Sequence, residues 1–536
     1  MYRVGIGAVL LGVLLLTAPP AAAQVSITGI IAGTVTDSTK AAIPGATVKL
    51  IDEGTKVEKS TVTNNSGVFT FRDLSLGSYV VTITLTGFRT ATYNKIFVEA
   101  GRTTEIRAEL AVGGVEQNVT VEGRSPVLDT TSNVIGSTLS NKEVQELPLG
   151  GRNAFTFARL VPGAVAPQGT GSTHYNGMPG GVINPTIDGV NNSSNGFKSG
   201  GTSFFGTVPA RLGAVEQVTV ETAGLGGDDG VTGGVNLKFI TRRGSARYTG
   251  SFFDQWRTDK LNANTFGNVA RGIAENDLNR HEFGGNFGGP VPIGSRNKLF
   301  FFVNHEVDYI PQTTTRETTV LTPEAQSGIF RYTTAAGVQQ TVNLYQMAAA
   351  AGLQSTPDPT IAALLAKEAD ARNYSTGEPG GTLRQETLSW REPQKAIDQF
   401  PTVRVDYQAR TNLSVMASYN RRNQDQQGRR VWPMPGMPIN ADTFNAGWWV
   451  FATGTNWTVN SNLHNELRFG IQHSGDTNEV GRQKEFFDLN GQVNGLSARF
   501  QLPLVSLLVA DNAPVIGKHY ITTFTDTFTM LRGTTH

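Results

Sequence analysis

NRHEFGGNFGGPVPIGSRNKLFFFVNHEVDY, residues Asn279 to Tyr309, consists of two strand-like runs on either side of a Gly/Pro/Asn turn. In the second run one face carries Leu299, Phe301, Val303, Val307 and Tyr309, and the other carries Asn304, Glu306 and Asp308. The alternation has exceptions, because His305 falls on the apolar face and Phe300 and Phe302 fall on the polar one. A strand of this length, apolar on one side and polar on the other, is typical of a wall between lipid and water.

The first residues predict a secretory signal peptide, residues 1–23. Arg3 precedes the apolar run Val4–Leu16, and the small residues Ala21–Ala23 predict cleavage after Ala23. No later apolar stretch has the length of a transmembrane helix, so we expect the mature chain to be a soluble exported protein or a β-barrel, the only spanning structure without helices. The sequence has no cysteine, which excludes disulfides and lipoprotein acylation.

Length and composition narrow the class further. The 536 residues are enough for several domains, and a formal net charge of +1 argues against a nucleic-acid partner, which would require a basic surface. The 61 glycines are scattered through strand and turn patterns without a collagen-like period. We therefore expect a β-rich exported protein.

Residues 27–112 have the pattern of a small β-sandwich, with short alternating runs separated by turn signals. The segments GTVTDSTKAAIPGATVKL and NNSGVFTFRDLSLGSYVVTITLTGF resemble the carboxypeptidase-regulatory-like domain, a transthyretin-like sandwich. Gly67 suits a position that needs positive φ. Neither a metal-ligand cluster nor a nucleophile accompanies the domain, so an accessory role is expected rather than a catalytic one.

Residues 115–243 carry a series of ordered motifs: VEQNVTVEGRSP, LPLGGRN, LVPG, IDGV and VEQVTVETAGLGGDDGVTGGVNLKFITRRGS. In this order they resemble the plug domain of Oar-like TonB-dependent receptors, and the stretch from Asn279 to Tyr309 resembles a block of the same family. The chain departs from many relatives at Thr241–Gly244, where a Thr-Lys-Ser-Gly type of turn is replaced by Thr-Arg-Arg-Gly.

Residues 246–536 are expected to form barrel strands. The predicted strands are Arg247–Arg257, Arg280–Gly289, Lys298–Tyr309, Thr402–Gln408, Asn412–Arg421, Trp448–Val459, Leu463–His473 and His519–Leu531. Alternation alone would also suit a soluble antiparallel sheet. The connections are more informative, because long ones (258–279, 310–401, 422–447 and 474–518) alternate with shorter ones (290–297, 409–411 and 460–462). Short turns on one side and long loops on the other are typical of outer-membrane barrels.

The number of strands predicts that the sequence is a fragment. Plugged outer-membrane transporters are barrels of about 22 strands, and a barrel of about eight has no room for a separate plug domain. We expect an in-frame continuation beyond His536 with many more alternating strands and an aromatic last residue.

The segment Val119, Thr120, Val121, Glu122, Gly123 is the candidate TonB box. Such a box is an extended peptide that adds a strand to a periplasmic partner through backbone hydrogen bonds. The alternative, that this segment is the last sandwich strand or a linker strand, stays open, because β-branched runs are common in strands.

Two further plug motifs contain candidate functional residues. For Arg152 and Asn153, we favour a structural arginine that pairs with a carboxylate inside the barrel over contact with a ligand. Asp188 and Gly189 suit a turn, where a structural role is again favoured over cargo binding.

Other motifs do not support catalysis or metal binding. Residues 224–234 lack the Gly-Lys-Ser/Thr of a phosphate loop and the spacing of an EF-hand, so we expect a plug loop there. His281-Glu282 and His305-Glu306 each lack the second histidine of a zincin. No catalytic residue, cofactor or metal is predicted.

Thr360–Arg372 predicts an amphipathic helix in the first large surface loop, either for binding or as a cover of the barrel mouth.

The predicted fold is mainly β: a transthyretin-like sandwich, an α+β plug domain and the first strands of a large antiparallel transmembrane β-barrel. The resemblance implies a bacterial outer-membrane TonB-dependent receptor or transporter, embedded in outer-membrane lipid and energised by an inner-membrane complex through a TonB-like periplasmic protein. The extracellular cargo is not identified by the residues. An alternative is a surface adhesion or structural barrel that binds glycan or matrix without transport. A third, enzymatic hypothesis predicts bound zinc, and we expect none.

Overall fold

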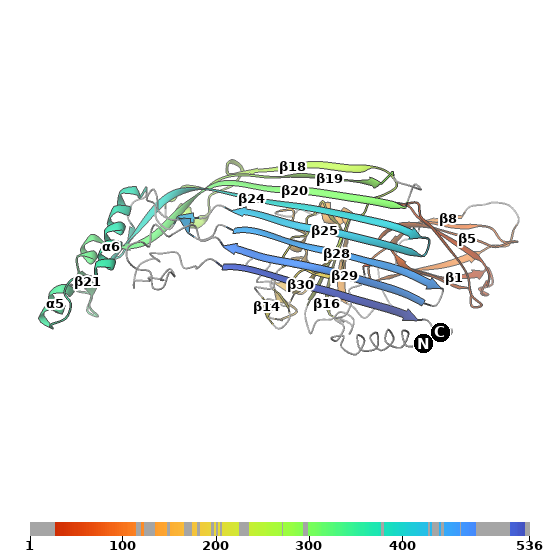
Figure 1. Ribbon diagram of the computed structural model, residues 1–536, viewed down its shortest axis with the longest axis horizontal. Helices are drawn as coiled ribbons and strands as arrows, with labels where there is room; N and C mark the ends of the chain where they lie inside the picture. The colour runs from red at the N-terminus through yellow and green to blue at the C-terminus, as the bar shows by residue number, and fades with distance from the viewer. Residues whose placement is uncertain are drawn as a thin grey trace, which may run out of the picture.

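The computed structural model describes residues 27–113, 119–122, 135–146, 151–165, 174–178, 183–193, 198–199, 202–203, 206–223, 235–270, 272–292, 298–376, 380–426, 429–430, 439–440, 444–460, 463–478 and 515–530. They form three parts in chain order: an N-terminal sandwich, a central α+β domain and a long antiparallel sheet (Figure 1). The predicted signal peptide lies outside the described residues.

The N-terminal sandwich consists of two sheets. One has the order β4 (Val68–Leu74), β1 (Gly29–Asp37), β7 (Thr103–Leu110), and the other β3 (Glu58–Val62), β2 (Thr47–Asp52), β5 (Gly77–Thr84), β6 (Ala91–Val98), β8 (Val119–Glu122). Alternate residues point into one shared core, which includes the fully buried Ile31, Val48 and Ile83. The predicted sandwich fold is confirmed.

Gly67 shows why this sandwich needs a glycine at the turn before β4. Its φ is +70°, a conformation that other residues rarely adopt. A Cβ at this position would lie 2.5 Å from the carbonyl oxygen of Val35. Both backbone conformation and space therefore exclude a side chain, in agreement with the prediction from the sequence.

The central domain, residues 135–241, is a small sheet with short helices. Its elements are β9 (Ile135–Ser140), α2 (Asn141–Glu146), η1 (Ala154–Arg159), β10 (Ala164–Val165), β11 (His174–Tyr175), β12 (Ile183–Ile187), β13 (Val190–Asn191), β14 (Lys198–Ser199), β15 (Thr202–Ser203), β16 (Val215–Ala223) and β17 (Val235–Thr241). The sheet order is β14-β15-β12-β17-β16-β9, with β12 and β17 parallel. All residues of these two strands are buried, as expected for strands covered on both faces.

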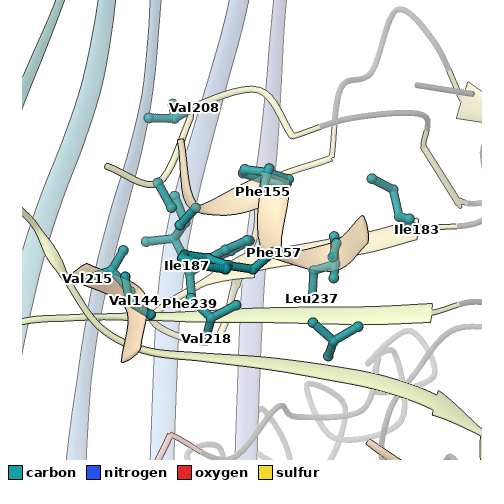
Figure 2. Packing of buried hydrophobic residues seen from close by; sticks show 14 of the residues in the cluster. Val144, Phe155, Phe157, Ile183, Ile187, Val208, Val215, Val218, Leu237 and Phe239 are labelled. Atoms are coloured by element: carbon teal, nitrogen blue, oxygen red, sulfur yellow. The ribbon is translucent and has the colours of Figure 1, made fainter. Parts of the chain in front are cut away.

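The core of the central domain is built around Phe157 and Phe239, packed between the strands and η1 (Figure 2). Two residues from the long antiparallel sheet, Val450 and Ala452, are buried in the same cluster. The central domain and the long sheet therefore share a hydrophobic core.

The long sheet, here called the barrel sheet, runs in the order β18 (Thr249–Thr258), β19 (Asp277–Pro290), β20 (Leu299–Leu321), β24 (Gln385–Arg410), β25 (Leu413–Gln426), β28 (Phe444–Asn460), β29 (Leu463–Asn478), β30 (Val515–Met530). Every neighbouring pair is antiparallel. Each of the eight predicted strands overlaps one of these strands. The sheet curves around the central domain, with the sandwich at one end and the helices α5 (Leu344–Ala350) and α6 (Pro359–Ala371) at the other (Figure 1).

The loop predicted from Ile310 to Pro401 is shorter in the structure than expected. β20 and β24 stay paired from Leu299 opposite Tyr407 as far as Leu321 opposite Gln385, so both ends of that range are strand. The threonine-rich run 313–319 favours strand by its β-branched side chains, but it lacks the apolar alternation that marked the lipid-facing part. Beyond the strands lie α4 (Pro323–Gln326), β21 (Ile329–Thr333), β22 (Gln339–Asn343), α5 (Leu344–Ala350) and α6 (Pro359–Ala371). The last matches the predicted helix Thr360–Arg372.

The two faces of the barrel sheet differ as the alternation predicted. On β20, Glu306 is fully buried against the central domain, whereas Val303 on the other face is 36% exposed. Phe300 and Phe302, the exceptions to the polar pattern, also point inward and are buried, and the Arg242 guanidinium lies over the Phe302 ring. The inward aromatic residues are therefore covered by protein.

None of the helices among the described residues is long and apolar enough to cross a membrane.

Candidate functional site

The charged side chains at the interface between the central domain and the barrel sheet form the candidate site. We call Arg152 and Arg211 of the central domain, with Glu282 of β19 and Glu306 of β20, the arginine–glutamate cluster. Arg152 Nε and Arg211 Nε lie 3.1 and 3.0 Å from Glu306 Oε2, and Arg211 Nη2 lies 3.0 Å from Glu282 Oε1. Arg211 thus joins two adjacent barrel strands to the central domain.

The local backbone of the central domain places both arginines side by side. Asn153 caps η1 by accepting a hydrogen bond from Phe155 N at 3.1 Å. The same residue forms an isolated antiparallel bridge with Arg211, and Leu212 N donates to Arg152 O at 3.1 Å. Two segments that are distant in sequence therefore present their guanidinium groups to the same carboxylate.

The side chains of this cluster are largely buried, so breaking one of their ion pairs costs more stability than breaking an exposed pair does. The Glu306 side chain is fully buried, and those of Arg211 and Glu282 are 5% and 7% exposed. Glu306 Oε1 also accepts a hydrogen bond from Gly213 N at 2.9 Å. Burying a carboxylate costs folding free energy unless the group is paired and hydrogen-bonded. The stability of this network therefore depends on the central domain being in place.

Aromatic rings and a second ion pair support the cluster. The Arg152 guanidinium lies 3.6 Å from the Phe253 ring centroid, and that of Arg211 lies 4.4 Å from Phe400, both on barrel strands. Arg280 of β19 pairs with Asp308 of β20 at 2.7 Å and reaches Glu282 at 3.2 Å. The inward carboxylates are thus neutralised from both sides.

Asp188 anchors a second contact between the central domain and the barrel sheet. It lies in the turn between β12 and β13 with φ of 49°, and Gly189 follows with φ of 81°. Its carboxylate accepts hydrogen bonds from Thr241 N at 2.9 Å and Ser418 Oγ at 2.5 Å, and Arg404 Nη1 lies 3.4 Å away. Arg404 is in turn paired with Asp406, at 2.8 Å. These contacts hold the turn between β12 and β13 against the inward face of β24 and β25.

The candidate TonB box is paired with the sandwich. Strand β8, Val119–Glu122, lies parallel to β6 at the edge of the sheet, with Val119 opposite Ala91 and Glu122 opposite Asn94. Gly123 lies outside the described residues. β8 has only four residues and is an edge strand of this sheet, with β6 as its strand neighbour.

Sequence reasoning singled out Arg152 and the inward Glu306 but not their partner Arg211. It also missed Arg404, which lies within the predicted strand Thr402–Gln408. No local pattern distinguishes Arg211 from a surface arginine, since its partners lie 71 and 95 residues later.

The two His-Glu pairs of the sequence lie on strands of the barrel sheet, one on β19 and one on β20. His281 contacts Asp254 at 3.5 Å on the barrel sheet, and His305 lies on its outward face. Within the part of the chain that the structure describes, His, Asp and Glu form no group of three that could hold a metal ion. The glycine-rich loop 224–234 lies outside that part.

An antiparallel sheet with an apolar outward face, curved around a domain that it contacts through buried ion pairs, defines an outer-membrane β-barrel protein. The chain belongs to the outer membrane beta barrel domain family, whose sequence model matches residues 240–536. The carboxypeptidase regulatory-like domain matches residues 30–111.

Relatives extend this assignment. The TonB-dependent transporter Oar of Myxococcus xanthus is 24% identical over 263 residues, which are 46% of this chain and 23% of that protein. With the two matched domains, it confirms the predicted resemblance to Oar-like receptors and the outer-membrane location.

Two solved structures are also similar. The outer membrane transporter YddB from Escherichia coli has a TM-score of 0.39 and 10% identity, covering 64% of this chain and 39% of that one. The ferric enterobactin receptor PfeA from Pseudomonas aeruginosa has a TM-score of 0.35 and 11% identity, covering 66% and 44%. The chain spans less than half the length of each of these relatives.

Proposed function

We propose that the protein is a TonB-dependent receptor that moves an extracellular cargo through its barrel, with the central domain as the plug. The observation that carries the proposal is the arginine–glutamate cluster. It ties the central domain to the inner face of the barrel through charges that are satisfied only in the closed arrangement.

The ion pairs of the cluster determine how much free energy is needed to move the central domain away from the barrel wall. Removing one partner of a buried ion pair costs about 3–5 kcal/mol, because the remaining charge stays buried without compensation. The outer membrane has no ATP, so this work has to arrive mechanically from the periplasmic side. A TonB-like partner that grips the chain just before the central domain can pull on the plug directly.

Residues 119–123 are the proposed grip. They lie between the sandwich and the central domain, and β-augmentation needs only an extended backbone with free hydrogen-bonding groups. One edge of β8 is hydrogen-bonded to β6. The partner can therefore bind the segment in two ways: it displaces β6 from that edge, or it adds a strand to the other edge of β8. The cargo would approach from the end of the barrel sheet that carries α5 and α6, where the long connections lie.

A backbone substitution in the complete polypeptide tests the grip. Val121→Pro removes a backbone N–H and blocks strand addition, whereas Val121→Ile keeps both the backbone and the β-branched side chain. We expect the proline variant to lose binding to the purified periplasmic domain of the TonB-like protein, and the isoleucine variant to bind as the wild type does. Heat-modifiable gel mobility checks that both barrels fold.

Equal binding by both variants would contradict the proposed grip. Unchanged uptake after deletion of residues 119–123 would argue for the alternative, a surface adhesion or structural barrel without energised transport through this segment. The excursion between β20 and β24, which projects beyond the rest of the barrel sheet, is the feature that suits such a role (Figure 1).

A further inference from the structure

We propose that the N-terminal sandwich is a second closure of the barrel, docked across its periplasmic mouth and acting in series with the central domain. The sandwich lies at the end of the barrel sheet opposite to α5 and α6 (Figure 1). Strands β24 and β25, and strands β28 and β29, are joined at that end by short connections, which is the periplasmic side in outer-membrane barrels.

One contact places the sandwich inside the rim of the mouth. Asp73, at the end of β4, has its Oδ2 3.2 Å from Nδ1 of His464 on β29. His464 shares its face of β29 with Gln472, which donates a hydrogen bond to Ser193 O of the central domain at 2.7 Å. That face therefore points into the barrel, and Asp73 reaches an inward-facing residue.

The sandwich is also bound to the segment that connects β17 of the central domain to β18 of the barrel sheet. Asp52 Oδ2 and Arg243 Nη2 lie 2.8 Å apart, with side chains 6% and 17% exposed. Ala246 N donates to Gly54 O at 2.9 Å, which ties the backbone of the sandwich to the chain between β17 and β18. Burial raises the pKa of the neighbouring Tyr79 hydroxyl, as expected for a closed junction.

An apolar cluster seals the junction. Ile27, Leu76 and Ala100 of the sandwich are buried together with Ile240 of β17 and Met416 of β25. A cavity beside this cluster is lined by residues of the sandwich, the central domain and the barrel sheet. All three parts thus meet at one point of the mouth, and a solute leaving the lumen there meets the sandwich.

Two closures in series predict a specific pattern of leakage. While either one is shut, ions do not pass, so weakening one closure has little effect. Only the loss of both opens the path, and the two effects are therefore strongly non-additive.

The test measures KCl conductance of the full-length protein in planar bilayers. The docking variant is Asp52→Ala with Asp73→Ala, and the plug variant is Arg211→Ala. We expect each alone to stay close to the wild-type conductance and their combination to exceed either by about tenfold. The idea is overturned if the combination conducts no more than Arg211→Ala alone, or if the docking variant alone conducts as much as the combination.

A disulfide distinguishes docking from misfolding. The chain has no cysteine, and Ala246 N donates a backbone hydrogen bond to Gly54 O at 2.9 Å, so these two residues are neighbours across the junction. Gly54→Cys with Ala246→Cys, added to the combined variant, should restore low conductance when oxidised and lose it on reduction. Lys49→Cys with Ser60→Cys, a pair within the sandwich, is the control and should restore nothing.

Persistent leakage of the oxidised Gly54–Ala246 pair would reject the sandwich as a closure. The measurement uses neither cargo nor a TonB-like partner, so its failure is separate from failure of the transport proposal.

Discussion

The guanidinium of Arg211 lies 3.0 Å from the carboxylate of Glu306, although 95 residues separate them in the chain. Glu306 has no exposed side-chain surface, so its charge is compensated by the central domain and not by water. The buried charge of Glu306 is therefore stable only when the central domain is in a position to pair with it. The energetics of that requirement can be measured directly.

Arg211→Ala should destabilise the protein by about 3–5 kcal/mol, because it leaves Glu306 and Glu282 buried with fewer positive partners. Arg102→Ala is the control, since Arg102 pairs with Glu99 at 3.1 Å on the surface of the sandwich, with both side chains more than a third exposed. That substitution should cost about 0–1 kcal/mol. Urea unfolding in detergent micelles provides the comparison, and equal losses for both variants would refute the assigned burial.

The Arg211→Ala and Glu306→Ala substitutions should be non-additive. The second removes the carboxylate that the first leaves without compensation, so the double variant should be more stable than the sum of the single losses predicts, by about 0.5–3 kcal/mol. A double-mutant cycle from the same urea unfolding curves yields this coupling energy. Strict additivity would mean that the two side chains do not interact.

Asp188→Ala should cost more than Asp188→Asn. Asparagine tolerates the positive φ of this turn and keeps one acceptor oxygen, whereas alanine loses both and leaves Thr241, Ser418 and Arg404 without their shared acceptor, at about 1–3 kcal/mol for each buried group. The control is Asn176→Ala at an exposed turn with φ of 48°, where the backbone cost is accompanied only by the loss of one exposed hydrogen bond, from Asn176 Nδ2 to Thr222 O at 3.4 Å. The midpoint of urea unfolding should be highest for the wild type, lower for Asp188→Asn and lowest for Asp188→Ala.

Val403→Arg should destabilise the barrel through its outward face. Val403 is 42% exposed on β24, on the face opposite to the inward Arg404, and an arginine near the middle of the lipid costs about 2–4 kcal/mol. Gln399→Arg, on the same face nearer the long-loop end, should cost about 0–1 kcal/mol. Folding into lipid vesicles, followed by heat-modifiable mobility, measures the difference. Equal effects would place both residues outside the lipid.

Gly67→Ala should weaken the sandwich more than Gly101→Ala. Both glycines have φ close to +70°, so both substitutions carry a backbone cost of about 1 kcal/mol. Only at Gly67 would the added Cβ meet another atom, the Val35 carbonyl oxygen at 2.5 Å, while Gly101 has open space. Protease cleavage within the sandwich of the intact protein, followed as a function of urea, separates the two. Equal cleavage midpoints would contradict the steric part of this argument.

Local patterns were sufficient to locate the strands of the barrel sheet and the surface helix α6. A strand that separates lipid from protein repeats its chemistry every second residue, and a short segment contains that signal in full. Where the repeat stops, as in the threonine-rich part of β20, strand and loop look alike, and the predicted loop was too long for that reason.

The partners of the charged residues came only from the folded chain. Arg152 meets Glu306 154 residues later, Arg404 meets Asp188 216 residues earlier, and Asp73 meets His464 391 residues later. The amino-acid pattern shows that an inward carboxylate needs a cation, but not which of the 45 lysines and arginines supplies it. That choice follows from how the sandwich, the central domain and the barrel sheet pack together, because an ion pair depends on distance in space and not on spacing in the chain.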